Sequence, residues 1–262
     1  MRRVAIVTGA TKNVGYGIVE RFINEGYDVV VTSRSAAAAQ SAAERLKTQC
    51  LQARTLGVGM DPGSVPDIRR AFAKIEQVME RIDVLVVNAA NLGMDMNIFF
   101  TTENDWDSVM NANAKGCFFC CQEAVRRMGA GSAICLISST HSRQSLPDRI
   151  VYAASKGAMN VIARTCAVEC AHKGIRVNTI IAGPLWTDRW NKLSQEERQT
   201  RRDIYPCGHE SKPEDVASAV YFLCSDQSST ITGAEVVVDS GVTLSLERPF
   251  DNNWRPQGRE NA

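Results

Sequence analysis

Two side chains that could exchange a proton lie four residues apart in Tyr152-Ala-Ala-Ser-Lys156, and Ser139 precedes the tyrosine by thirteen residues. On a helix, side chains four residues apart share one face. At about 5 Å and an effective dielectric constant of about 20, the ammonium of Lys156 favours the phenolate of Tyr152 by about 3 kcal/mol. We therefore expect the tyrosine pKa to fall by about two units, toward the range of a general acid or base. Because this spacing also arises by chance on many helices, other features of the chain are needed to show whether the pair is catalytic.

The residues around the pair favour a helix. Apolar and small residues recur there at helical intervals, at Ile150, Ala154, Gly157, Val161, Thr165 and Val168. We expect this stripe to pack beneath the polar pair.

Length and composition describe an ordinary soluble α/β protein. The chain has 262 residues, of which 44% are hydrophobic and 23% charged. A net charge of +1 gives no sign of a nucleic-acid or membrane partner. The nine cysteines are scattered in apolar runs and no targeting segment precedes the first strand. These features predict reduced thiols and a cytoplasmic location.

Short apolar runs alternate with longer amphipathic segments from the first residue to about Gly241. We expect buried strands at residues 4–7, 29–31, 84–87, 134–137, 177–181 and 236–238, with a weaker one at 54–58. Helical spacing is clearest at Val65, Ile68, Phe72, Ile75, Met79 and Ile82. Capping boxes are expected at 194–197 and at 211–214, the second opening a helix that runs to about Cys224. The alternation predicts an α/β fold with a single doubly wound, Rossmann-type domain, in which helices cover both faces of a parallel, seven-stranded sheet.

Two segments stand outside this alternation. Residues 182–213 form a long insert within the expected domain of residues 1–244, and residues 245–262 form a polar C-terminal tail. The tail either lacks fixed structure, as its composition suggests, or is anchored on a neighbouring subunit by Phe250 and Trp254.

A glycine-containing loop follows the first expected strand and precedes a helix. It reads Thr8-Gly9-Ala10-Thr11-Lys12-Asn13-Val14-Gly15. Such a turn lets the backbone approach a pyrophosphate at the N-terminus of the helix. Asn13 replaces a glycine that such loops usually have, and asparagine tolerates a left-handed backbone better than most residues. The candidate cofactor residues here are Gly9, Thr11, Lys12, Asn13, Val14 and Gly15.

Ser33 and Arg34 follow the second expected strand, where an NAD-binding site would place an acid for the ribose 2′-hydroxyl. An arginine suits a 2′-phosphate instead, and Lys12 adds a second cation in the glycine loop. The two loops therefore predict NADP(H) as the cofactor.

Further motifs follow in an order that resembles the short-chain dehydrogenase/reductase family over about residues 3–244. The matching stretches are Thr8, Gly9 and Gly15; Asp61; Asn88-Ala89-Ala90; residues 106–113 with Asn113; Ile137-Ser138-Ser139; Tyr152 with Lys156; residues 176–184; and Asp239-Ser240-Gly241. The thirteen-residue gap to Tyr152 selects Ser139 over Ser138. The chain departs from the family pattern only in turns, at Asn13, Ala90, Ala182 and Ser240.

The resemblance implies a catalytic tetrad of Asn113, Ser139, Tyr152 and Lys156. Tyr152 would protonate the oxygen of a ketone as NADPH reduces it, and Ser139 would hydrogen-bond the same oxygen. Lys156 would lower the tyrosine pKa and hold the nicotinamide ribose, while Asn113 would hold a water that links Lys156 to solvent. The cofactor contacts that the resemblance adds are Asp61, Asn88, Ala89, Tyr152, Lys156, Gly183, Pro184 and Thr187. It also implies a homodimer or homotetramer through the helices that carry Cys117 and Tyr152.

The family places its substrate over the nicotinamide, so three loops supply candidate substrate residues. These are Met94, His141, Leu146, Trp186 and Trp190. They suggest an apolar ketone, steroid-like or aromatic, although both tryptophans could equally pack the insert against the body. His141 is expected to be a solvated or hydrogen-bonded histidine, and Arg143 to face water more readily than a substrate carboxylate.

Two other functions stay open. A 3-oxoacyl-thioester reductase would need a basic surface for an acidic carrier protein, for which Arg126, Arg127, Arg201 and Arg202 are candidates. A catalytically retired member would bind NADP as a sensor or scaffold, but it would have no need to keep all four catalytic side chains. No metal site is expected, because His141, His172 and His209 lack ligand spacing and Cys117, Cys120 and Cys121 look like small buried helix residues.

Overall fold

Seven parallel strands form one sheet in the order β3-β2-β1-β4-β5-β6-β7. In the computed structural model of the chain, residues 2–244 are described, apart from the side chains at positions 188 and 189. The strands are β1 (Val4–Val7), β2 (Asp28–Ser33), β3 (Thr55–Gly59), β4 (Ile82–Val87), β5 (Met128–Ser139), β6 (Arg176–Ala182) and β7 (Glu235–Val238). β1 pairs with both β2 and β4, so the strand order reverses at this point. The predicted seven-stranded, doubly wound α/β fold is confirmed.

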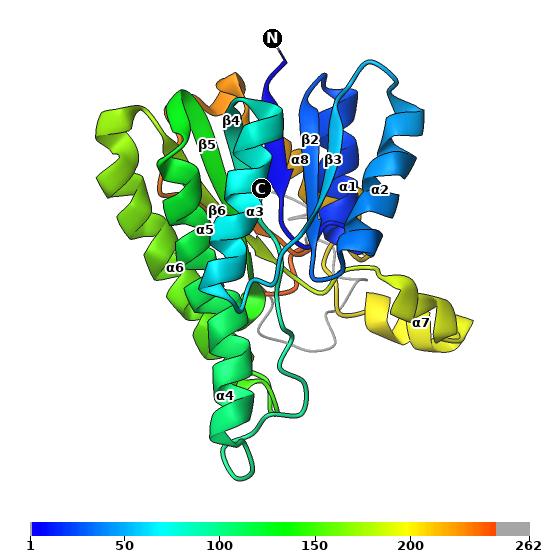
Figure 1. Cartoon of the computed structure of the whole chain (residues 1–262). Helices are drawn as coiled ribbons and strands as arrows, with labels where there is room; N and C mark the ends of the chain where they lie inside the picture. Colours follow the sequence, from blue (N-terminus) through cyan, green and yellow to red (C-terminus); the bar gives the residue numbers. More distant parts are fainter. Residues whose placement is uncertain (1, 245–262) are drawn as a thin grey trace, which may run out of the picture.

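Helices cover both faces of the sheet (Figure 1). They are α1 (Asn13–Asn24), α2 (Ala36–Gln49), α3 (Val65–Met79), α4 (Glu103–Met110), α5 (Gly116–Val125), α6 (Ile150–Cys170), α7 (Gln195–Arg202) and α8 (Pro213–Cys224). One core cluster joins the sheet to α3, α5 and α6, and a second joins it to α1, α2 and α8. None of the described helices has the length and apolarity needed to cross a membrane.

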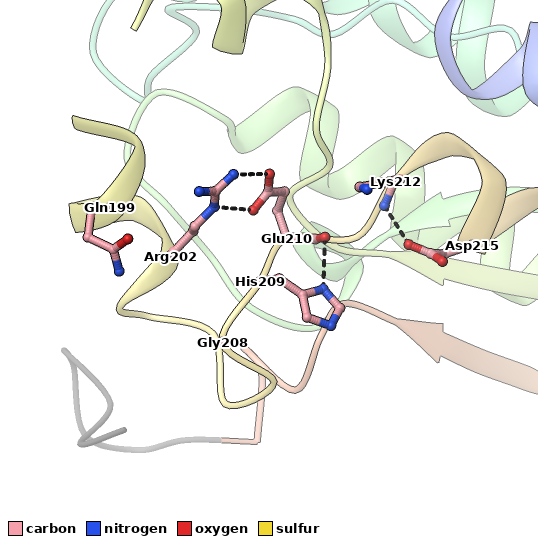
Figure 2. A pocket seen from close by; sticks show the side chains of 7 residues that line it. All are labelled: Gln199, Arg202, Gly208, His209, Glu210, Lys212 and Asp215. Carbon is pink, nitrogen blue, oxygen red and sulfur yellow. Dashed lines mark hydrogen bonds and ion pairs between the residues drawn. The ribbon is translucent and has the colours of Figure 1, made fainter. Parts of the chain in front are cut away.

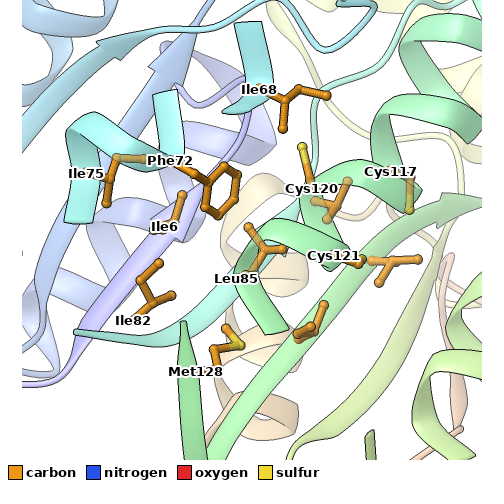
Figure 3. Packing of buried hydrophobic residues seen from close by; sticks show 14 of the residues in the cluster. Ile6, Ile68, Phe72, Ile75, Ile82, Leu85, Cys117, Cys120, Cys121 and Met128 are labelled. Atoms are coloured by element: carbon orange, nitrogen blue, oxygen red, sulfur yellow. The ribbon is translucent and has the colours of Figure 1, made fainter. Parts of the chain in front are cut away.

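The cysteines of α5 lie in the first of these core clusters. Figure 3 shows Cys117, Cys120 and Cys121 among aliphatic side chains of the sheet and of α3. Burial raises the pKa of the Cys120 thiol far above its usual value. All nine cysteines are free thiols. The interpretation of the α5 cysteines as small buried helix residues is therefore confirmed.

Two predicted helix boundaries are wrong, the end of α3 by three residues and the start of α8 by one. Ile82 starts β4 and does not continue the stripe of α3, because the helix stops at Met79 and Glu80 turns left-handed with φ 62°. α8 begins one residue later than expected. The backbone N–H of Lys212 donates to Asp215 at 2.7 Å, while the Ser211 hydroxyl bonds to Ser240 at 3.0 Å.

The stripe expected to lie beneath Tyr152 and Lys156 is on the outside of α6, and that prediction is wrong. Val161 is 54% exposed and Val168 is 79% exposed. The side of α6 that packs on the sheet carries Ser155, Met159 and Ala163 instead. Periodicity identified an apolar stripe, but it could not show whether the stripe faces the chain's own core or a surface.

Candidate functional site

The carboxyl ends of the strands bring the catalytic candidates together. Ser139 ends β5, and Tyr152 lies in the first turn of α6, which packs against that strand. The side chains of Ser139 and Tyr152 are hydrogen-bonded. Ser138, whose side chain points to the other face of β5, donates instead to the backbone oxygen of Lys156 at 3.3 Å. The alternation of the strand thus separates the two adjacent serines.

Lys156 is only 2% exposed. Its Nζ donates to the backbone oxygen of Ile137 at 2.7 Å and lies 5.6 Å from the centre of the Tyr152 ring. Burial lowers the lysine pKa from 10.5 to about 8, because a desolvated ammonium loses its hydration. The lysine is therefore close to losing its proton at ordinary pH.

The predicted fall in the tyrosine pKa is wrong for this structure. Burial raises the pKa of Tyr152, while the hydrogen bond from Ser139 and the charge of Arg149 oppose that rise only in part. The spacing of the two residues gives the attraction between their charges but not the desolvation, which disfavours the phenolate. In addition, the Lys156 ammonium donates to a backbone oxygen.

Asn113 lies in a π-helical turn, Asn111–Lys115, between α4 and α5, and its side chain is 1% exposed. Its Oδ1 accepts from the Asn91 N–H at 2.7 Å, and its Nδ2 donates to the Asn91 oxygen at 2.9 Å and to the Ser155 hydroxyl at 2.9 Å. The Ser155 hydroxyl donates in turn to the backbone oxygen of Tyr152 at 2.7 Å. Asn113 thereby ties the loop after β4 to the first turn of α6.

The loop after β1 is fixed against the loop after β4. The Thr8 hydroxyl accepts from the N–H groups of Asn88 and Ala89, both at 2.9 Å. The Asn88 side chain donates in return to the backbone oxygens of Thr8 and Gly9, at 2.9 and 3.0 Å. Gly9 has φ 64° and Asn13 has φ 50°, so the asparagine does adopt the left-handed backbone expected of it.

The same loop fits a dinucleotide phosphate. α1 begins without a side-chain cap and has no acidic residue in its first turn, so its N-terminal N–H groups remain available to an anion. Lys12 and Arg34 are exposed, and within the described residues neither has an ion-pair partner. Asp61 is also exposed, and its side chain accepts from the Gly63 N–H at 3.0 Å.

Arg45, on α2, is a further cation at this loop. Its Nη2 donates to the Thr11 oxygen at 3.3 Å, and its guanidinium lies 5.2 Å from the centre of the Tyr16 ring. No sequence signal identifies it, because it lies two to three helical turns beyond the loop that carries Arg34.

The candidate substrate residues lie in different surroundings. The ring of His141 meets Tyr152 edge to face, with 5.6 Å between the centroids. Met94 and Leu146 are exposed. Trp190 is 4% exposed and packs with Tyr205 and Val242, which is the packing role that the sequence left open.

Arg143 neither faces water alone nor lies free for a substrate. It forms an ion pair with Glu235 at 2.6 Å. Of the remaining cofactor candidates, Gly183 contacts Asp239 so closely that a Cβ there would fall 2.4 Å from the aspartate Cβ. Thr187 is the N-cap of the short helix Asp188–Lys192 in the insert.

Comparison with known proteins agrees with this geometry. Residues 9–243 match the family model described as Enoyl-(Acyl carrier protein) reductase. The chain is 33% identical over 248 residues to the NADP-dependent (R)-specific alcohol dehydrogenase of Lentilactobacillus kefiri, covering 92% of this chain and 96% of that protein. The chain belongs to the short-chain dehydrogenase/reductase family.

Two other relatives differ in the function that their names give. The chain is 31% identical over 242 residues to the 3-oxoacyl-[acyl-carrier-protein] reductase FabG of Aquifex aeolicus, covering 92% and 97% of the two chains. A solved structure of a blue fluorescent protein from a metagenomic library, in complex with NADPH, superposes with a TM-score of 0.84 at 28% identity. That match covers 92% of this chain and 97% of the other.

The insert of this short-chain dehydrogenase/reductase adjoins the glycine loop across a pocket of about 710 Å³. Asn13 and Tyr16 line it from α1, and Trp186 and Thr187 line it from the insert. A neighbouring pocket of about 480 Å³ shares Arg202, Glu210 and Lys212 with it. Figure 2 shows the Arg202 guanidinium paired with Glu210 through two hydrogen bonds, of 2.8 and 3.0 Å. This pair holds α7 against the segment before α8.

Changing Gly15 to alanine should disrupt the glycine loop. A Cβ at this position would fall 2.6 Å from both the Asn88 Nδ2 and the Gly9 oxygen. We expect Gly15→Ala to weaken NADPH binding by at least about tenfold and to lower the free energy of unfolding by about 1–3 kcal/mol. Fluorescence titration with NADPH and urea unfolding would measure both. Gly129→Ala is the control, because a Cβ there meets no atom within 4 Å. Equal behaviour of the two variants would contradict the expectation.

Proposed function

We propose that this protein interconverts a ketone and a secondary alcohol, with NADP(H) as the hydride carrier and Tyr152 as the acid and base. The convergence of Ser139, Tyr152 and Lys156 carries the proposal. The NADP-dependent alcohol dehydrogenase and the NADPH complex among its relatives support the cofactor. We propose an apolar ketone, because exposed Leu92, Met94 and Leu146 lie on the loops that follow β4 and β5.

The residues at the site would divide the work as follows. Bound NADPH supplies a hydride. Tyr152 donates its phenolic proton to the substrate oxygen, and the raised pKa of its phenol keeps that proton in place until negative charge develops. Ser139 orients the same oxygen by a hydrogen bond. The pKa of Lys156, about 8, is close to ordinary pH, so the lysine can return a proton toward the tyrosine. Asn113 fixes the first turn of α6 through Ser155.

A panel of ketones and secondary alcohols, assayed with NADPH or NADP⁺ by absorbance at the nicotinamide band, tests the proposal. We expect turnover of apolar ketones and a clear preference for NADP(H) over NAD(H). Tight NADPH binding without turnover of any carbonyl compound would overturn it and would favour a sensor or scaffold.

Arg34→Ala should change the choice of cofactor. We expect the exposed guanidinium of Arg34, which follows β2, to bind the 2′-phosphate. Hydrogen bonds to charged groups contribute about 1.5–3 kcal/mol. We expect kcat/KM for NADPH to fall about 10- to 100-fold while kcat/KM for NADH changes by less than about twofold. NADH serves as the internal control. An equal fall in kcat/KM for both cofactors would show that Arg34 does not bind the 2′-phosphate.

The similarity to a 3-oxoacyl-[acyl-carrier-protein] reductase keeps a second function in view. An acidic carrier protein would need an uncompensated basic surface. Glu123 forms ion pairs with both Arg126 and Arg127, and Glu210 forms one with Arg202. Because these arginines are already paired with carboxylates, a carrier-protein substrate has less support than a small-molecule substrate.

We also propose a homodimer or homotetramer in the cytoplasm. The exposed stripe of α6, with Val161 and Val168, and the 42% exposed Phe118 of α5 would be covered by a second copy of the chain. The nine free thiols favour a reducing compartment. Residues 245–262, expected either to lack fixed structure or to be anchored on a neighbouring subunit, lie outside the described part of the chain.

A further inference from the structure

Arg149 lies immediately before α6 and three residues before Tyr152, and its side chain is partly buried. Within the described residues its guanidinium has no carboxylate partner, and its Nη1 donates only to the sulfur of Met94. Arginine side chains are rarely withdrawn from water unless they are paired. Among the described residues, Arg149 is therefore a partly buried cation with no carboxylate partner, and its guanidinium is available to an added anion.

The backbone around Arg149 is fixed, so the cation is held in place. The residues on either side of it bond to the loop after β4. The Met96 N–H donates to the Asp148 oxygen at 3.2 Å, and the Ile150 N–H donates to the Met96 oxygen at 3.3 Å. The Asp148 carboxylate itself accepts from the Asn97 side chain at 3.0 Å, so it is turned to another partner. The backbone that carries Arg149 is thus held against the loop after β4, and its guanidinium contacts Met94 of that loop.

The neighbourhood of Arg149 joins the reacting tyrosine to an apolar surface. Arg149 is the N-cap of α6, three residues before Tyr152, whose ring meets His141 edge to face. Burial raises the pKa of Tyr152 and lowers that of His141, and the Arg149 charge opposes the first change and adds to the second. Met94 and Leu146, on the loops around it, are 43% and 57% exposed. By contrast, Arg143 on the same loop is paired with Glu235, a carboxylate that it shares with Arg164. A molecule that uses all of these features has an apolar body, a carbonyl group and an anionic end.

We propose that Arg149 binds a carboxylate carried by the substrate, so that the substrate is an apolar oxo acid and not a neutral ketone or a thioester. This inference rests on the proposed ketone reduction and names its substrate class. The planar guanidinium suits a carboxylate because it can donate two parallel hydrogen bonds. His141, whose pKa is lowered by burial and by Arg149, stays neutral at the same place and can add a hydrogen bond without a charge.

Matched pairs of substrates test the role of Arg149. We would measure kcat/KM with NADPH for oxo(phenyl)acetate, 4-oxo-4-phenylbutanoate and 5-oxo-5-phenylpentanoate, each beside its methyl ester. In at least one pair the acid should be preferred over the ester by at least about tenfold. Arg149→Gln should lower kcat/KM about 10- to 100-fold for that acid and less than about threefold for its ester. Arg149→Lys should retain part of the activity with the acid, since lysine keeps the positive charge but lacks the two parallel N–H donors of the guanidinium.

Arg143→Gln is the control, because it removes a cation that is already paired on the same loop. It should leave the ratio of acid to ester unchanged. An equal loss for acid and ester in Arg149→Gln would overturn the proposal and would assign Arg149 to the tuning of Tyr152. Absence of any preference for acids in the wild-type protein would overturn it as well, while leaving ketone reduction standing.

A binding measurement separates this inference from the proposed reaction. Calorimetric titration of the NADPH-saturated protein with 4-phenylbutanoate and with 4-phenylbutanamide compares a charged ligand with a neutral one. We expect the acid to bind at least about tenfold more tightly, and the difference to vanish in Arg149→Gln. If no ketone is reduced but this difference is found, the proposed reaction fails and the carboxylate site stands. Equal affinities for the acid and the amide would contradict the proposed carboxylate site.

Discussion

Tyr152→Phe is expected to reduce kcat for ketone reduction by about 10³- to 10⁴-fold while the Kd for NADPH stays within about threefold of the wild-type value. The substitution removes one hydroxyl and keeps the ring that packs against His141. General acid catalysis by a positioned side chain contributes about 10²- to 10⁴-fold, and here no other phenol is hydrogen-bonded to Ser139 among the described residues. Steady-state kinetics and fluorescence titration with NADPH give the two quantities.

Tyr27→Phe is the matched control for this substitution. Tyr27 is also a buried tyrosine, 6% exposed, but its hydroxyl interacts with Arg3 at 3.5 Å, away from the catalytic residues. Its kcat should stay within about twofold of the wild-type value. If Tyr152→Phe retained full activity, Tyr152 could not be the acid and base, and the proposed reaction would need another proton donor.

The strands and the spacing of the catalytic residues could be predicted from the sequence, because both depend on residues close together in the chain. Strands of a parallel sheet are buried on both faces, so most of them read as short apolar runs rich in β-branched residues. All seven strands were located, although β3 gave a weaker signal and β5 begins at Met128, before the predicted run. The backbone at Asn13 was also predictable, because only a few residue types tolerate a positive φ. Such features depend on residues close together in the chain.

Features that depend on distant contacts were not predicted. Arg143 and Glu235 are separated by 92 positions, and no local pattern links them. The π-helical turn at Asn111–Lys115 and the partners of Asn113 likewise arise from packing between separate segments. The largest error concerned Lys156, since spacing places its charge near the tyrosine but gives no measure of desolvation. The pair could be found from the sequence, whereas its pKa values required the burial of both groups.

The burial of Lys156 leads to a second large expected effect, in which activity and stability change in opposite directions. Lys156→Met should lower kcat/KM by about 10³-fold, because the cation beside Tyr152 is lost. At pH 7 the variant should nevertheless be more stable than the wild-type protein, by about 2 kcal/mol. Burial of the ammonium costs up to about 3 kcal/mol, from the pKa change of 10.5 to about 8, and loss of the bond to Ile137 offsets about 1 kcal/mol.

The dependence of this stability difference on pH follows from the direction of the pKa shift. Between pH 8 and 10.5 the unfolded chain keeps a proton on Lys156 that the native protein has released, so the wild-type protein gains stability as the pH rises through this window. The advantage of Lys156→Met should therefore be full below pH 8 and should have shrunk substantially by pH 10. Urea unfolding of both proteins at pH 7 and pH 10 measures it, with Lys74→Met as the control at an exposed lysine. A stability difference that stays constant with pH would mean that Lys156 does not titrate in this window, and that its proton is unavailable to Tyr152.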